Sequence, residues 1–90
     1  MNILTKTSPK GDELVATWNP AKVAEGDPEA LAAVAEAERI FEELRTGKNP
    51  QKIAYTPFAI DDPVTRNGHQ IDKFEPMAGE ISMRHPIAGG

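Results

Sequence analysis

The chain has 90 residues, with eight prolines, seven glycines and no cysteine, and its formal net charge at pH 7 is −4. This length allows one domain at most, and the lack of cysteine excludes disulfides, thiolate metal sites and a cysteine nucleophile. The charge is −4 in residues 1–47 and zero in residues 48–90, without the basic patch that nucleic-acid binding requires. No apolar run resembles a membrane span or a secretory signal, so we expect a cytoplasmic protein that does not contact a membrane.

The first elements predict an N-terminal β-hairpin. Residues 3–7 are rich in β-formers, and residues 8–12, Ser-Pro-Lys-Gly-Asp, form a turn cluster. Residues 13–18 then alternate in polarity as a strand does. One face of this strand would carry Leu14, Ala16 and Trp18.

The next segment predicts the main helix of the chain, from residue 28 to residue 45. Asp27 followed by Pro28 is typical of a helix start, and Gly47 suits the position just after a helix end. We expect residues 19–27 to be a connecting stretch that leads into the helix. The apolar face of the helix would carry Val34, Ala37, Phe41 and Leu44.

The second half of the chain predicts further strands. Residues 53–58 read as a strand, and Asn67-Gly68 is a strong hairpin signal that would join residues 64–66 to residues 69–74. Residues 80–85 alternate again, which places Ile81 and Met83 on the inner face, and Pro86 ends this strand.

The order of strand, strand, helix and further strands predicts an α+β fold, with one helix across a mixed sheet. Because the last strand runs directly into the C-terminal residues, the order describes a β-grasp. We expect a β-grasp domain over residues 1–86 and a flexible diglycine tail over residues 87–90. Most of the large apolar side chains should form the core, namely Ile3, Leu14, Trp18, Val34, Phe41, Ile53, Ile71, Phe74, Ile81 and Met83.

Residues 79–90 read Gly-Glu-Ile-Ser-Met-Arg-His-Pro-Ile-Ala-Gly-Gly. This segment resembles the C-terminus of ubiquitin-like protein modifiers and sulfur carriers, such as the molybdopterin-synthase small subunit. The resemblance implies that a ubiquitin-activating-type enzyme adenylates the carboxylate of Gly90 and that Gly89 lets the tail thread a narrow channel. It also implies that Pro86, Ile87 and Ala88 dock the base of the tail.

The chain would then be the substrate of an adenylating enzyme, with a conjugating enzyme or a target protein as a further partner. It would not itself be an enzyme and would need no cofactor. Two alternatives stay open. The tail could carry a thiocarboxylate as a sulfur carrier, or the chain could be a structural or binding module, such as a phage or accessory protein, with an incidental Gly-Gly end.

The remaining polar residues favour structural roles. His69 and His85 lack the spacing of a metal or catalytic site, so we expect no metal. The acidic pairs Asp61-Asp62 and Glu42-Glu43 fit a loop and a solvated helix face. We expect solvated side chains at the six lysines, although each could accept another copy's tail: Lys6, Lys10, Lys22, Lys48, Lys52 and Lys73.

Overall fold

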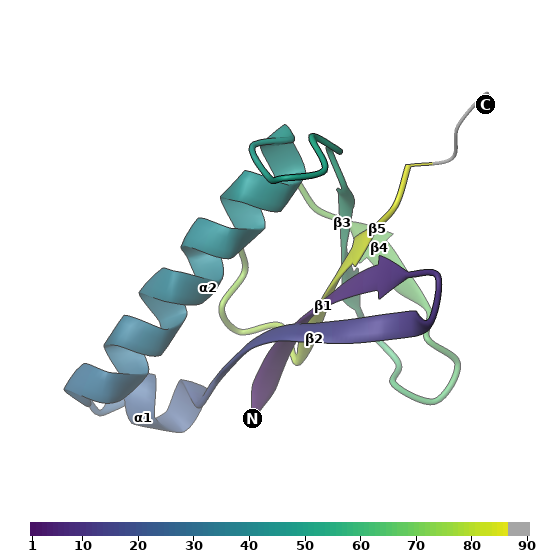
Figure 1. Cartoon of the computed structure of the whole chain (residues 1–90). Coiled ribbons are helices and arrows are strands. Elements are labelled where there is room, and N and C mark those ends of the chain that lie inside the picture. Colours follow the sequence, from purple (N-terminus) through teal and green to yellow (C-terminus); the bar gives the residue numbers. More distant parts are fainter. Residues whose placement is uncertain (87–90) are drawn as a thin grey trace.

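The structure, a computed structural model, describes residues 1–86 and is α+β. Its elements are β1 (Asn2–Ser8), β2 (Gly11–Trp18), α1 (Pro20–Ala24), α2 (Pro28–Thr46), β3 (Thr56–Ile60), β4 (Gly68–Gln70) and β5 (Glu80–Arg84). The five strands form one mixed sheet, and α2 packs across one of its faces (Figure 1). The predicted fold class is therefore confirmed at this level.

The sheet has the strand order β2-β1-β5-β3-β4. Strand β5 lies at its centre, parallel to β1 on one side and antiparallel to β3 on the other. Ile81, for example, is paired with Leu4 across the first boundary and with Ala59 across the second. The last strand of the chain is thus held by backbone ladders on both sides, which fixes its register and direction.

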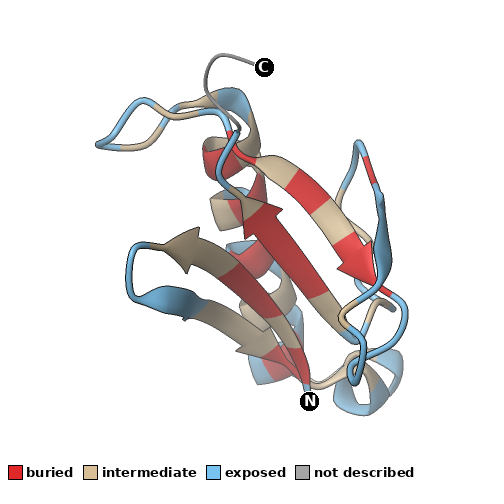
Figure 2. Ribbon diagram, turned by 90° about the vertical axis from the view of Figure 1, so that its right-hand side faces the viewer, coloured by how far each residue is buried: buried red, intermediate tan, exposed pale blue. Residues whose placement is uncertain are grey.

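The core lies between α2 and the sheet, and Figure 2 shows the buried residues along the central strands, with α2 behind them. Phe74 joins the two largest core side chains, because its ring centroid lies 5.2 Å from that of Trp18 and 5.7 Å from that of Phe41. Ile81 and Met83 are completely buried, as predicted. Burying such side chains contributes about 1.5–3 kcal/mol each. The buried cluster consists of Leu4, Trp18, Ala37, Phe41, Leu44, Tyr55, Ala59, Ile71, Ile81 and Met83.

The prediction that Leu14 faces the core is wrong. The register between β1 and β2 shifts, so that Leu4 pairs with Ala16 while Thr5 pairs with Leu14, and Val15 is the extra residue. Such a bulge reverses the alternation of side chains on one side of it. Val15 therefore packs against the core, whereas the Leu14 side chain is 58% exposed.

The connecting stretch of residues 19–27 contains a short helix, α1, that was not predicted from the sequence. Asn19 caps it by accepting hydrogen bonds from the backbone N–H groups of Ala21 (3.0 Å) and Lys22 (3.3 Å), and Pro20 occupies its first turn. The same combination of an Asx cap and a proline starts α2, whose predicted boundaries are confirmed within one residue. No helix within residues 1–86 is long and apolar enough to cross a membrane.

The third strand begins at residue 56 instead of residue 53. The Asn49 side chain satisfies the backbone of Ile53, donating to its carbonyl oxygen at 2.7 Å and accepting from its N–H at 3.3 Å. The N–H of Tyr55 donates to the carbonyl of Leu44 at 2.8 Å, at the end of α2. These backbone groups are satisfied by the helix end and its loop, so the ladder can start only after them.

The predicted hairpin between residues 64–66 and residues 69–74 is also wrong. Strand β4 contains only Gly68–Gln70 and pairs with β3. The intervening loop is closed by Asp62, whose Oδ1 accepts from the N–H groups of Val64 (2.9 Å) and Thr65 (3.4 Å). This Asx turn lies in the loop that reverses the chain, a role that the sequence analysis assigned to Asn67-Gly68.

Candidate functional site

The predicted site begins where β5 ends. Arg84, the last residue of β5, pairs with Thr56 of β3, and its guanidinium carbon lies 4.5 Å from the ring centroid of Phe58. Two residues later the chain reaches Pro86, which is exposed. Residues 85 and 86 therefore follow the central strand of the sheet, beside the β1–β2 turn and the loop between α2 and β3 (Figures 1 and 2).

His85 attaches this exit point to the domain. Its backbone N–H donates to the Oγ1 of Thr7 at 2.8 Å, which extends the contact between β5 and β1 beyond the last ladder pair. Its imidazole meets the ring of Tyr55 edge to face, with centroids 5.8 Å apart, and its Nδ1 lies 2.9 Å from the carbonyl oxygen of Pro86. The chain is thus held by specific contacts up to the residue that precedes the tail.

Of the five residues predicted to act in the tail, the structure describes only Pro86. Ile87, Ala88, Gly89 and Gly90 lie outside the described residues. The structure therefore adds the base of the tail, which includes Thr7 and Tyr55. Neither residue was singled out from the sequence. Both come from segments far from residue 85 in the chain, so that no local pattern could reveal them.

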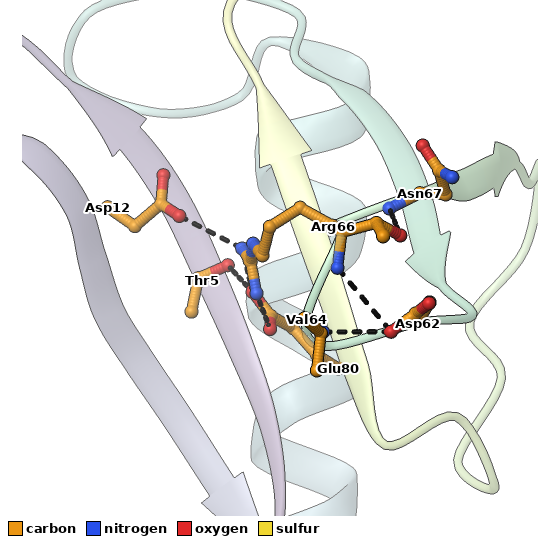
Figure 3. Close-up of polar contacts among 8 residues, drawn as sticks. Thr5, Asp12, Asp62, Val64, Arg66, Asn67 and Glu80 are labelled. Atoms are coloured by element: carbon orange, nitrogen blue, oxygen red, sulfur yellow. Dashed lines mark hydrogen bonds and ion pairs between the residues drawn. The ribbon is translucent and has the colours of Figure 1, made fainter.

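A polar cluster fixes the opposite end of β5 (Figure 3). The Arg66 guanidinium pairs with both carboxylate oxygens of Glu80, at 2.7 Å for the Nη2–Oε2 contact, and with Oδ2 of Asp12 at 3.0 Å. The hydroxyl of Thr5 donates to the same Glu80 carboxylate at 2.9 Å. Arg66 thereby links the β3–β4 loop to β5 and β2 across the face of the sheet that α2 does not cover.

Glu80 is the most buried acid of this cluster, with a side chain only 12% exposed. The hydrogen bond from Arg66, and after it the one from Thr5, holds the pKa of this carboxyl below its ordinary value. A carboxylate that is kept ionised by a bidentate guanidinium is a structural anchor, because it is a poor proton donor or acceptor. The cluster thus fixes the start of the strand that leads to the tail.

The other polar residues considered from the sequence have structural partners. His69 is exposed, and its Nδ1 lies 3.0 Å from Oδ2 of Asp61, a contact that raises its pKa. Asp62 closes its own loop, and Glu42 and Glu43 pair with arginines along α2, as expected for a loop residue and a solvated helix face. Within residues 1–86 no three His, Asp or Glu side chains gather as a metal site would require.

A cleft of about 550 Å³ lies beside the base of the tail. The β1–β2 hairpin forms one wall, the loop that follows α2 forms the other, and the exit of β5 adds His85. No local sequence pattern indicates this cleft, because its walls come from three separate segments. Its lining residues are Lys6, Thr7, Ser8, Pro9, Glu13, Gln51, Ile53, Tyr55 and His85.

Comparisons with known proteins do not assign a family. No protein-family model, no curated protein and no solved structure matches this chain.

Proposed function

We propose that this chain is a ubiquitin-like β-grasp protein whose Gly90 carboxylate is adenylated by an activating enzyme and then joined to a target amine. The observation that carries the proposal is the position of β5. This strand is paired on both sides at the centre of the sheet, and it leads within two residues to the Pro-Ile-Ala-Gly-Gly segment that starts at Pro86.

The arrangement of the sheet supports the finer fold assignment. A β-grasp combines an N-terminal hairpin, a helix across one face and a last strand inserted beside the first, in parallel. The order β2-β1-β5-β3-β4, the parallel β1–β5 pair and the packing of α2 on a single face are compatible with each of these features.

The proposed chemistry needs only the tail of this chain. An oxygen of the Gly90 carboxylate attacks the α-phosphorus of ATP, pyrophosphate leaves, and an acyl-adenylate forms. A nucleophile then attacks the Gly90 carbonyl carbon and AMP leaves. The absence of a Cβ at Gly89 and Gly90 leaves room around the attacked carbonyl in a narrow channel. The activating enzyme supplies the catalytic groups, so the part of this chain is to present the carboxylate.

The contacts at the tail base support such a role. The domain holds the chain firmly at His85 through Thr7 and Tyr55, and Arg66 anchors the beginning of β5 through Glu80. If another protein binds the tail, the strand that connects the tail to the domain is therefore β5, which is paired on both sides in the sheet. In this proposal the activating enzyme recognises the five residues that follow His85 as a unit.

The test is ATP–pyrophosphate exchange in desalted extract from cells that produce this chain, with purified chain added. An intact mass first establishes that the Gly90 carboxylate of the added protein is free. We expect exchange above background with the full chain and none with a variant that lacks Gly89 and Gly90. Circular dichroism and thermal unfolding of this variant control for its fold.

Equal exchange with both proteins contradicts the proposal. So does the absence of exchange with both proteins, provided that an added ubiquitin and its activating enzyme respond in the same extract.

The nucleophile distinguishes the two branches of the family. A product in which sulfur replaces one carboxylate oxygen identifies a sulfur carrier, and a larger product cleaved at an isopeptide bond identifies a modifier. If deletion of both glycines leaves the cellular function intact, the chain is a binding module with an incidental end.

A further inference from the structure

The cleft at the base of the tail has a chemical character of its own. Its walls combine apolar surface from Pro9 and Ile53 with polar groups from Lys6 and Tyr55. Sites that bind ligands are concave, largely apolar and provided with a few converging polar groups. The question is which ligand these particular groups would recognise.

Tyr55 supplies the first indication. Its side chain is only 6% exposed and belongs to the core cluster, but its hydroxyl makes no hydrogen bond to any of the described residues. Tyr55 also lines the cleft, and no side-chain polar atom of residues 1–86 is both fully buried and unpaired. A phenol in the wall of a cleft can offer a hydrogen-bond donor to an occupant.

Lys6 supplies the second indication. Its side chain is only 19% exposed, unlike that of a solvated lysine, and it lies on the cleft wall. The nearest acid is Glu13, with Nζ 3.8 Å from Oε2, which is too long for a hydrogen bond. The ammonium therefore keeps donors available within a partly desolvated wall, where a carboxylate interacts more strongly than in water.

The charge around the cleft points the same way. The wall segments 6–10 and 47–55 contain Lys6, Lys10, Lys48 and Lys52 and no acidic residue, and Glu13 of β2 is the one acidic side chain among the lining residues. Lys10 and Lys52 are exposed neighbours of the lining residues Pro9 and Ile53. Positive charge thus continues beyond the cleft along both walls, which suits an extended acidic ligand better than a single small anion.

We propose that this cleft binds an acidic segment of a protein partner. One carboxylate of the segment accepts hydrogen bonds from Lys6 Nζ and Tyr55 Oη, and an adjoining apolar side chain packs against Pro9 and Ile53. Further carboxylates face the lysines of the rim. Because His85 borders both the cleft and the tail base, the bound segment lies next to Pro86. The inference goes beyond activation of the tail and does not depend on it.

The test is a titration of the isotope-labelled chain, followed by NMR, with a blocked peptide in which aspartates flank a leucine. The matched probe replaces both aspartates by asparagine, and sodium propionate serves as the small carboxylate. We expect saturable shifts at Lys6, Ile53, Tyr55 and His85 with the acidic peptide, and none with the asparagine peptide. Propionate should bind at least about tenfold more weakly, because it lacks the contacts of the rim.

Variants test the assigned contacts. Lys6→Met and Tyr55→Phe should each weaken the acidic peptide by about tenfold, the equivalent of one charge-assisted hydrogen bond. Glu13→Gln should tighten binding, because it removes the carboxylate that competes for Lys6. Lys22→Met, on α1 and outside the cleft, is the matched control and should change nothing. Glu13 is exposed, so its variant gives a result even if a change at the buried Tyr55 disturbs folding.

The inference is overturned by shifts outside the cleft, by equal binding of the acidic and asparagine peptides, or by no saturation at the solubility limit. Propionate binding as tight as that of the peptide would instead identify a small-anion site and would also overturn it. The chain that lacks Gly89 and Gly90 should bind the peptide like the full chain. Failure here therefore leaves the proposed activation of the tail untouched, and failure of that activation leaves this result standing.

Discussion

Gly68 is required for the close approach of two backbones, which differs from the role that its sequence suggested. The Asn67-Gly68 pair is typical of a hairpin turn, where glycine supplies a positive φ. Gly68 instead lies in β4, opposite Ile60, and a Cβ built on it would come within 2.3 Å of the carbonyl oxygen of Ala59. The neighbour is backbone in the middle of β3, so that it cannot move aside cheaply.

We therefore expect Gly68→Ala to lower the free energy of unfolding by about 1–3 kcal/mol, as overpacking of well-packed sites does. Gly79→Ala is the matched control, because a Cβ there meets nothing within 4 Å. Urea denaturation followed by circular dichroism measures both. An alanine at position 68 that is tolerated as well as one at position 79 would show that β4 does not approach β3 so closely.

Glu80 makes the stability of the domain depend on pH. Its carboxyl has a pKa below the ordinary value of 4.5 in the folded protein, mainly because of the hydrogen bond from Arg66. A group whose pKa is lower in the folded state stabilises the fold above its unfolded pKa, and this contribution disappears as the pH falls through the folded pKa. The contribution of Glu80 is thus complete at neutral pH and is lost on acidification below about pH 4.5.

Glu80→Gln should lower the free energy of unfolding at pH 7 by about 1–3 kcal/mol, since it leaves Arg66 with a weaker acceptor. The difference from the unmodified protein should shrink as the pH falls below 4.5. Asp62 and Glu36 also have lowered pKa values but are present in both proteins, so the difference isolates Glu80. Denaturation curves at several pH values give the comparison, with Glu38→Gln on the exposed face of α2 as the control. A difference that stays constant from pH 7 to pH 3 contradicts this account.

Among the elements, α2 was the most predictable because its signals are local. Asp27 accepts a hydrogen bond from the N–H of Ala30 at 3.0 Å, and Gly47 ends the helix in the left-handed conformation with φ of 80°. Both residues were assigned these roles from the sequence. The Asn19-Pro20 pair carries the same start signal for α1, but this helix has five residues and buries none, so no apolar periodicity marked it.

The two caps should differ in their effect on stability. Asp27→Ala should cost about 1 kcal/mol, because the cap supports a helix that carries much of the core. Asn19→Ala should cost only a few tenths of this amount, since α1 contributes no buried side chain. Thermal unfolding of the two variants at the same pH makes the comparison. An equal or larger effect of Asn19→Ala would mean that α1 supports the fold more than its burial indicates.

The strands were less predictable because distant contacts decide where they begin and which way they face. The bulge at Val15 turns Leu14 outward, although the alternation of residues 13–18 by itself would place it inside. The side chain of Asn49 holds Ile53 out of the sheet. Both outcomes depend on contacts with distant parts of the chain. The orientation of Leu14 depends on the register between β1 and β2, and the start of β3 depends on contacts with the end of α2 and the loop after it.

At the scale of the whole molecule, the site depends on contacts that no local pattern carries. Arg66 joins Glu80, 14 residues away, and Asp12, 54 residues away. The cleft likewise joins the first hairpin, the loop after α2 and the end of β5. The resemblance of residues 79–90 implies a chemistry for the tail, which stays a prediction, but the surroundings of the tail base became visible only once the topology brought these segments together.

The same topology predicts how firmly each strand is held. Strand β5 is central and buried, whereas β4 is a three-residue edge strand whose residues are all exposed. Amides of β5 and β1 should therefore exchange with solvent only through global unfolding, and those of β4 through local opening at a much smaller free energy. Hydrogen exchange measured residue by residue tests this, with rates at Leu4, Ile81 and Met83 compared with those at His69 and Gln70. If the β5 amides exchanged as fast as those of β4, the strand that leads to the tail would be too weakly held to present it to another protein.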